Sequence, residues 1–214
     1  HMDFRYWNNN LGSLIKLHID DFYSPKDLVK EFDLEGKMEP QATYGNLQLG
    51  DQGSKRFIQS GDRFYERDGE RFAIIVSQDQ DGDQRIVFIT NTSGRGVELL
   101  DELEEDFYAN GPLNGAFFDM SYNFRKRSEM VDELLAWNPT IRSQLKKDVL
   151  DFLRLMAILG MRGLPNSRGV ILSGAPGTGK TMYAKSLAAE AETTTILISA
   201  EMIQQRHDVK TAFK

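Results

Sequence analysis

Between residues 43 and 90, short apolar or aromatic stretches alternate with Gly and Asp every several positions. This spacing is typical of antiparallel strands joined by turns. Its clearest unit is a pair of apolar runs, 71–77 and 84–90, on either side of Asp81-Gly82. Because that dipeptide suits the positive φ of tight hairpin turns, we predict a β-hairpin here within a β-rich region.

Two helices are predicted in the same half of the chain. Ser24 is a cap residue, Pro25 suits the first helical position and Asp27 can reach back to the cap amide, so we predict a helix that ends near Gly36. Residues 98–106 place six acids among leucines at i, i+3/i+4 spacing, which predicts an amphipathic helix with a charged outer face. A solvated face and a partner-binding face are both compatible with that charge.

The pattern changes after Asn138-Pro139, a helix start. One side of the following segment is apolar up to Gly160, which predicts a helix, and its positions are Ile141, Leu145, Val149, Phe152 and Met156. The β-branched run 168–173 predicts a strand, 182–189 is strongly helical in propensity, and 193–199 predicts a second buried strand. Strand, helix and strand in this order predict a βαβ unit with a parallel sheet.

Charge divides the chain at nearly the same place. Residues 3–125 hold 13 Lys and Arg against 23 Asp and Glu, whereas residues 126–214 hold 13 against 9, within a total of −6. Such a shift is typical of a domain boundary. We predict an N-terminal domain over 3–121, a junction over 122–138 and a C-terminal domain over 139–214. The acidity of the first domain argues against nucleic-acid binding there.

Composition excludes several classes of protein. There is no cysteine among the 214 residues, which removes disulfides, cysteine nucleophiles and thiolate metal sites, and favours a reducing, cytoplasmic location. No apolar run approaches the roughly 18 residues of a membrane helix. We interpret His1-Met2 as a tag remnant and find no signal peptide behind it.

Metal chemistry finds little support. Alternate aspartates at Asp79, Asp81 and Asp83 invite a calcium interpretation, but Gly stands fourth instead of sixth and Thr90 occupies the twelfth position, where an EF-hand needs Glu. A solvated hairpin tip is the simpler interpretation. The three histidines lie far apart in sequence and lack metal-ligand spacing.

The candidate chemistry lies directly after 168–173. The pattern G-x-x-x-x-G-K-T is complete there, and it consists of Gly174, Ala175, Pro176, Gly177, Thr178, Gly179, Lys180 and Thr181. Polyphosphate is held by a loop whose backbone N–H groups point inward at the positive end of a helix. We expect Gly174 and Gly179 to supply conformations that a Cβ would block, Lys180 to bridge the β- and γ-phosphates, and Thr181 to ligate Mg²⁺. With Met182, these residues form the predicted ATP-binding set.

At these residues the chain resembles the AAA+ ATPases, and within them the AAA group. The resemblance covers about 128–214 and rests on 168–172 leading into the loop and on 196–203, which is similar to the family's second strand and following helix. It implies an incomplete α/β P-loop NTPase domain with a parallel sheet, preceded by an α+β N-terminal domain with antiparallel strands. It also implies ATP and Mg²⁺ as ligands, Lys180 as a catalytic residue, a hexameric assembly, and remodelling of a protein client or adaptor recruited by the acidic domain.

The chain departs from the family pattern at two places. Ala175-Pro176 stands for two prolines, and residues 204–207 stand where family members usually carry an aromatic-Gly pore loop, which puts peptide threading in doubt. Only 33 residues follow Thr181, and none of them forms a hydrophobic run ending in the acidic pair that holds Mg²⁺ and polarises water. We therefore expect a fragment: ATP hydrolysis by the complete protein and none by these residues alone.

Two other functions stay open. The loop does not specify what hydrolysis drives, so a nucleotide kinase or a nucleic-acid loader is an alternative ATPase. A binding or assembly module that does not hydrolyse nucleotide is the second.

Overall fold

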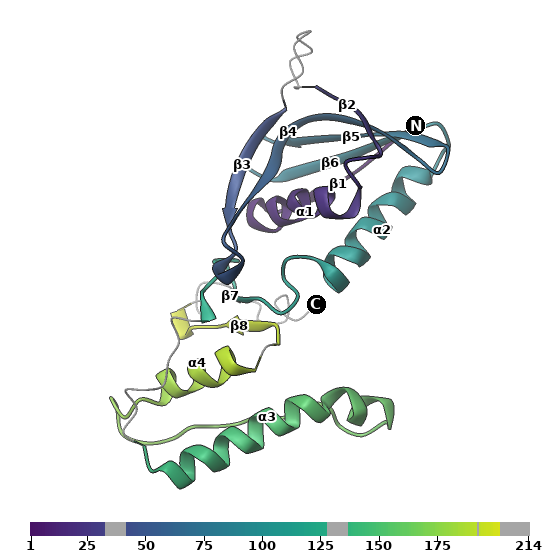
Figure 1. The fold of residues 1–214 in the computed structure, drawn as a ribbon. Coiled ribbons are helices and arrows are strands. Elements are labelled where there is room, and N and C mark those ends of the chain that lie inside the picture. The colour runs from purple at the N-terminus through teal and green to yellow at the C-terminus, as the bar shows by residue number, and fades with distance from the viewer. Residues whose placement is uncertain (33–41, 128–136, 192, 202–214) are drawn as a thin grey trace.

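The computed structural model describes residues 1–32, 42–127, 137–191 and 193–201. The elements in chain order are β1 (Met2–Trp7), α1 (Asn9–Phe22), β2 (Leu28–Phe32), β3 (Thr43–Gln48), the short 3₁₀ helix η1 (Gly50–Gln52), β4 (Ser54–Arg67), β5 (Glu70–Gln78), β6 (Gln84–Thr90), α2 (Arg95–Asn110), β7 (Phe117–Asp119), α3 (Pro139–Met161), α4 (Lys180–Glu190) and β8 (Thr195–Leu197) (Figure 1). None of the helices in these ranges combines the length and apolar character that a membrane crossing needs.

The N-terminal residues form an antiparallel sheet in the order β1-β6-β5-β4-β2, with β3 also paired to β4. The predicted hairpin is confirmed as β5 and β6, whose register pairs Ala73 with Ile89. At its tip, Asp79 Oδ1 accepts the backbone N–H groups of Asp81 at 3.0 Å and Asp83 at 2.8 Å. The alternate aspartates therefore close a turn, which is the role expected of short polar side chains.

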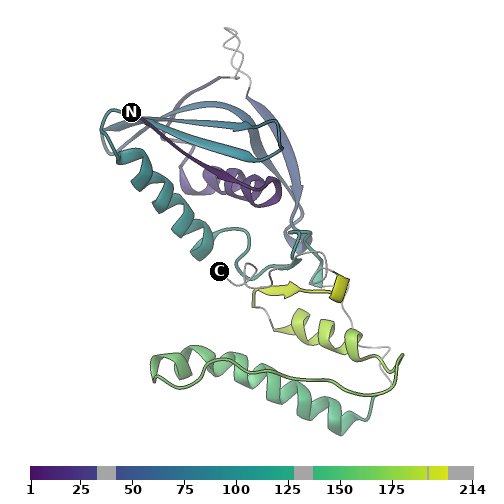
Figure 2. The same cartoon turned by 180° about the vertical axis from the view of Figure 1, so that it is seen from behind.

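Helices α1 and α2 lie on the same side of this sheet in both views (Figures 1 and 2). Alternate side chains of the central strands meet them in one hydrophobic core, to which α1 contributes Leu14, Ile15, Leu17 and Ile19 and α2 contributes Leu99, Leu100, Leu103 and Phe107. The predicted amphipathic helix at 98–106 is thus confirmed within α2. Helix α1 approaches closely because Gly12 has no side chain; a Cβ there would lie 2.3 Å from Cβ of Gln84.

Much of the acidic charge of α2 is matched by arginines within the chain. Arg5 of β1 forms ion pairs with Glu104 and, at an N-to-O distance of 2.6 Å, with Asp101. Arg95 forms ion pairs with Glu98 at 3.0 Å, with Glu102 at 2.8 Å and with Glu70 of β5 at 3.0 Å. The pairs of Arg5 and the Arg95–Glu70 pair connect α2 to the sheet, whereas the pairs of Arg95 with Glu98 and Glu102 lie within the helix.

The opposite face of the sheet is also apolar. Met2, Phe4 and Tyr6 of β1 are 56%, 53% and 47% exposed there, and Phe64 of β4 is 41% exposed. The guanidinium of Arg85 lies 4.7 Å from the ring centre of Phe4. Strands that are apolar on both faces read as continuous apolar runs, which explains the sequences of β5 and β6.

The helix predicted from Pro25 to Gly36 is wrong over its described part. Residues 25–27 form a turn, in which the N–H of Asp27 donates to Ser24 O at 2.9 Å, and the chain then enters β2. Strand β2 pairs antiparallel with β4, and Leu28 packs against the core. Pairing with a sheet edge overrides the local helix signal. Residues 33–36 lie outside the described residues.

The C-terminal residues form layers in which α4 lies between β8 and α3 (Figures 1 and 2). The predicted helix after Asn138-Pro139 is confirmed as α3. The second predicted strand is confirmed in part as β8, which pairs in parallel with β7 through Phe117–Thr195 and two further residue pairs. Because β7 lies inside the predicted N-terminal domain, the pairing crosses the predicted junction, and the boundary at 122–138 stays a prediction.

The strand predicted at 168–173 is wrong, because these residues have no regular secondary structure. Ile171 is 92% exposed and Val170 48%. A strand is held by hydrogen bonds to a neighbour, and β8 pairs with β7 instead of this segment. The structure therefore has the helix and second strand of the predicted βαβ unit, and its small parallel sheet is β7-β8.

Candidate functional site

The loop over 174–181 owes its shape to three glycines. Gly174, Gly177 and Gly179 have φ angles of 149°, 77° and 84°, values that residues with a Cβ adopt only under strain. The expectation for Gly174 and Gly179 is confirmed, and Gly177 joins them. Gly179 is also the N-cap of α4, so the last glycine turns the chain into the helix.

The helix N-terminus supplies hydrogen-bond donors. The N–H of Tyr183 donates to Gly179 O at 2.9 Å. The N–H groups of Lys180, Thr181 and Met182 precede this bond and have no acceptor in the preceding turn of helix. The positive end of the helix dipole lies at the same place, which suits an anionic ligand.

The ammonium of Lys180 lies within the loop. Its Nζ donates to Ala175 O at 2.6 Å, Gly174 O at 3.0 Å and Thr178 Oγ1 at 3.2 Å. Thr178 Oγ1 in turn donates to Ala175 O at 2.9 Å. A positive charge is thus held next to the helix N-terminus, and the two together favour a polyphosphate.

Two aromatic residues that the sequence analysis did not identify support the loop. The indole N–H of Trp137 donates to Thr178 O at 2.5 Å, and its ring lies 4.6 Å from the ring of Tyr183. Tyr183 is buried, and its hydroxyl donates to Arg142 O of α3 at 2.9 Å. The sequence signal that could have identified Trp137 is its position directly before the Asn-Pro helix start. These contacts tie the loop and α4 to the start of α3.

A cavity of about 300 Å³ lies between α3, α4 and the segment before the loop. Its lining is mostly aliphatic and includes Leu145, Val149, Leu172 and Leu187. Such a lining suits packing of apolar side chains, whereas the donors for phosphate lie at the loop. We therefore place the candidate site at 174–182.

The other sequence candidates do not gather at this site. His18 is buried under α2, where its Nε2 lies 2.8 Å from Asp106 Oδ2. Within the part of the chain that the structure describes, no three His, Asp or Glu side chains are grouped as metal ligands would be. Residues 204–207, at the place of the family's pore loop, lie outside the described residues.

Comparison with known proteins supports the resemblance inferred from the loop. Residues 170–214 match the family model of the ATPase family associated with various cellular activities (AAA). The chain is 30% identical over 99 residues to the ATP-dependent zinc metalloprotease FtsH 1 of Rhodopirellula baltica, which covers 44% of this chain and 14% of that protein. It is 35% identical over 66 residues to the probable mitochondrial chaperone bcs1 of Schizosaccharomyces pombe, which covers 31% of this chain and 15% of that protein. The resemblance to AAA+ ATPases is confirmed for this part of the chain, which spans about one seventh of each relative.

Proposed function

We propose that this chain, with the AAA family sequence of residues 170–214 as its nucleotide-binding segment, binds ATP through the loop at 174–182. The observation that carries the proposal is the junction of loop and helix: the glycine-shaped loop, the ammonium of Lys180 and the N-terminus of α4 meet at one place. These are the donors that a triphosphate needs.

Each residue of the loop has a role in this proposal. The backbone N–H groups from Gly177 to Met182 bind phosphate oxygens, Lys180 offsets the charge of the β- and γ-phosphates, and the hydroxyl of Thr181 ligates Mg²⁺. Bound Mg²⁺ would neutralise charge on the phosphates. The exposure of Thr181 and Met182 at the start of α4 fits these roles.

Hydrolysis is proposed for the whole protein. The acidic pair that polarises the attacking water is not identified among these residues, so we expect the 214-residue chain to bind ATP without turnover. Calorimetry and a phosphate-release assay on this chain test both expectations. Binding without release agrees with the proposal. Turnover that disappears in Lys180→Ala would instead show that the catalytic carboxylate lies among these residues.

The finer parts of the proposal rest on the resemblance. They are remodelling of a protein client or adaptor recruited by the N-terminal residues, and assembly into a hexamer. A measurement of particle mass with and without ATP on the whole protein tests assembly. A nucleotide kinase would instead transfer phosphate from ATP to an added nucleotide, and that assay separates the alternative.

A further inference from the structure

Arg127 caps the C-terminus of the helix that begins at the loop. Its Nη1 donates to Ala188 O at 2.5 Å and to Ala189 O at 3.3 Å. The last carbonyl groups of a helix have no intrahelical donor and carry the negative end of the helix dipole. A guanidinium at this place therefore stabilises the end of α4.

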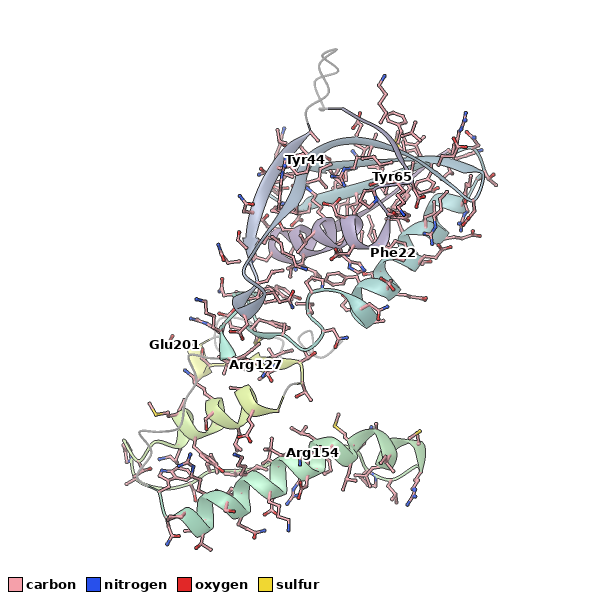
Figure 3. All side chains as sticks on the ribbon, viewed as in Figure 1. Phe22, Tyr44, Tyr65, Arg127, Arg154 and Glu201 are labelled. Carbon is pink, nitrogen blue, oxygen red and sulfur yellow. The ribbon has the colours of Figure 1, made fainter. Side chains whose placement is uncertain are left out.

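The other terminal nitrogen of Arg127 binds the two segments that lead into the parallel sheet. Nη2 donates to Thr193 O at 2.5 Å, before β8, and to Gly115 O at 2.9 Å, before β7. The N–H of Thr195 donates to Ala116 O at 2.8 Å in the same place. One side chain thus joins α4, β7 and β8, and Figure 3 shows Arg127 among these elements.

The backbone of Arg127 is held by the N-terminal sheet. Its N–H donates to Asp51 Oδ2 at 2.7 Å, and Asp51 lies in η1 between β3 and β4. Gly50 of the same turn approaches so closely that a Cβ there would lie 2.5 Å from Arg125 O. The N–H of Arg125 donates to Phe117 O at 2.7 Å. The side chain of Arg127 therefore extends from a fixed backbone toward α4.

These contacts join the two ends of α4 to different parts of the molecule. Its N-terminus belongs to the phosphate loop, and its C-terminus binds a residue fixed to the N-terminal sheet. Eleven helical residues span about 16 Å, so a displacement at one end is transmitted along a rigid element. We propose that Arg127 is a positioning residue that couples nucleotide binding at the loop to the β3–β4 turn. This inference rests on the proposed function.

The geometry requires arginine. The planar guanidinium directs one nitrogen to the end of α4 and the other toward β7 and β8, whereas the ammonium of lysine is a single point with three donors. Arg127→Lys therefore keeps the charge and loses the bridge. Arg125→Lys is the matched control, because the Arg125 side chain is half-exposed and its guanidinium lies 3.7 Å from the carboxylate of Asp119.

Hydrogen exchange on the whole 214-residue chain, with and without MgATP, tests the coupling. In the wild type, ATP should slow exchange about fivefold at 179–186 and also at 113–119 and 49–53. In Arg127→Lys, ATP should still slow exchange at 179–186 but no longer at 113–119 and 49–53. The affinity for ATP should change by less than about threefold. Arg125→Lys should behave as the wild type.

The outcomes separate the two proposals. Without slower exchange at the loop in the wild type, the proposed function fails, and the coupling fails with it. Slower exchange at the loop that does not reach 49–53 in the wild type overturns the coupling alone. Arg127→Lys that folds and transmits the change as the wild type does would also overturn it.

Discussion

The buried Lys16 of α1 offers a quantitative test of the N-terminal core. Its side chain is fully buried between the helix and the sheet, where Nζ donates to Gln84 Oε1 at 2.5 Å, Gln59 O at 2.8 Å and Ser77 O at 3.0 Å. Desolvation lowers the pKa of this ammonium from 10.5 to about 8. At a pH between about 8 and 10.5, the unfolded chain therefore binds more protons than the folded chain.

The sign and size of the effect follow from that difference. Below pH 8, Lys16 is charged in both states and the cost of burying its charge is fully present; above pH 10.5, it is neutral in both states and the cost is gone. The free energy of unfolding should therefore rise as the pH rises from 8 to 10.5. At about 1.4 kcal/mol per pKa unit, the contribution is at most about 3.5 kcal/mol.

Lys16→Met is the matched variant, because it keeps the length of the side chain and removes the titrating group. It leaves three acceptors without their donor, so we expect it to be about 2–4 kcal/mol less stable than the wild type at pH 7. Urea unfolding, followed by fluorescence of Trp7 in a Trp137→Phe background, measures both proteins at several pH values. The stability difference should widen by up to about 3.5 kcal/mol between pH 8 and 10.5. Parallel curves over this range would refute the reasoning.

Three further predictions concern the helix–sheet contact, the N-terminal residues and the loop. Gly12→Val should destabilise the protein by at least about 2 kcal/mol in urea unfolding, since its Cβ would meet Gln84 at 2.3 Å; unchanged stability would contradict the packing. Residues 3–121 alone should melt cooperatively, because they hold most of the antiparallel sheet and both helices of the hydrophobic core, although β7 loses β8 and its backbone bond from Arg125; an absent transition would reject the two-domain prediction. Gly179→Ala should weaken ATP binding at least about tenfold in calorimetry, because alanine is strained at φ 84°. A global melting temperature near that of the wild type is the control. Unchanged affinity for ATP would contradict the role of the loop.

Elements with a one-sided or turn-bounded pattern were predictable from the sequence. The hairpin β5-β6 has a turn dipeptide between apolar runs, α2 has leucines at helical spacing, and α3 follows an Asn-Pro start. Helix α1 was not predicted. Helix α1 has seven buried positions that are consecutive or nearly so, and they include the polar Lys16 and His18. Its sequence therefore lacks the periodic apolar stripe that identifies a surface helix.

The two wrong elements failed for the same physical reason. Ser24-Pro25 starts a turn whose continuation is decided by the edge of β4, and the apolar run 168–173 becomes a strand only with a hydrogen-bonding neighbour. Both outcomes depend on residues distant in the sequence, which local patterns do not encode.

The candidate site was predictable as far as its backbone chemistry. Glycine spacing and Lys180 identified the loop, because those residue types are required at those positions. Trp137 and Arg127 were not identified, since their roles come from packing against α4. Arg127 lies next to the position where the charge of the chain changes, and the sequence indicated nothing more about it.

ATP binding at the loop is tested most directly by the fluorescence of Trp137, which donates to Thr178 O within it. The chain has two tryptophans, so Trp7→Phe leaves Trp137 as the reporter. Titration of this variant with MgATP should give a saturable change with a dissociation constant no tighter than about tens of micromolar. Adding Lys180→Ala should weaken binding about 10- to 100-fold. Saturation at the same concentrations with and without Lys180, or no change up to millimolar ATP, would contradict the assignment of the loop as the nucleotide site.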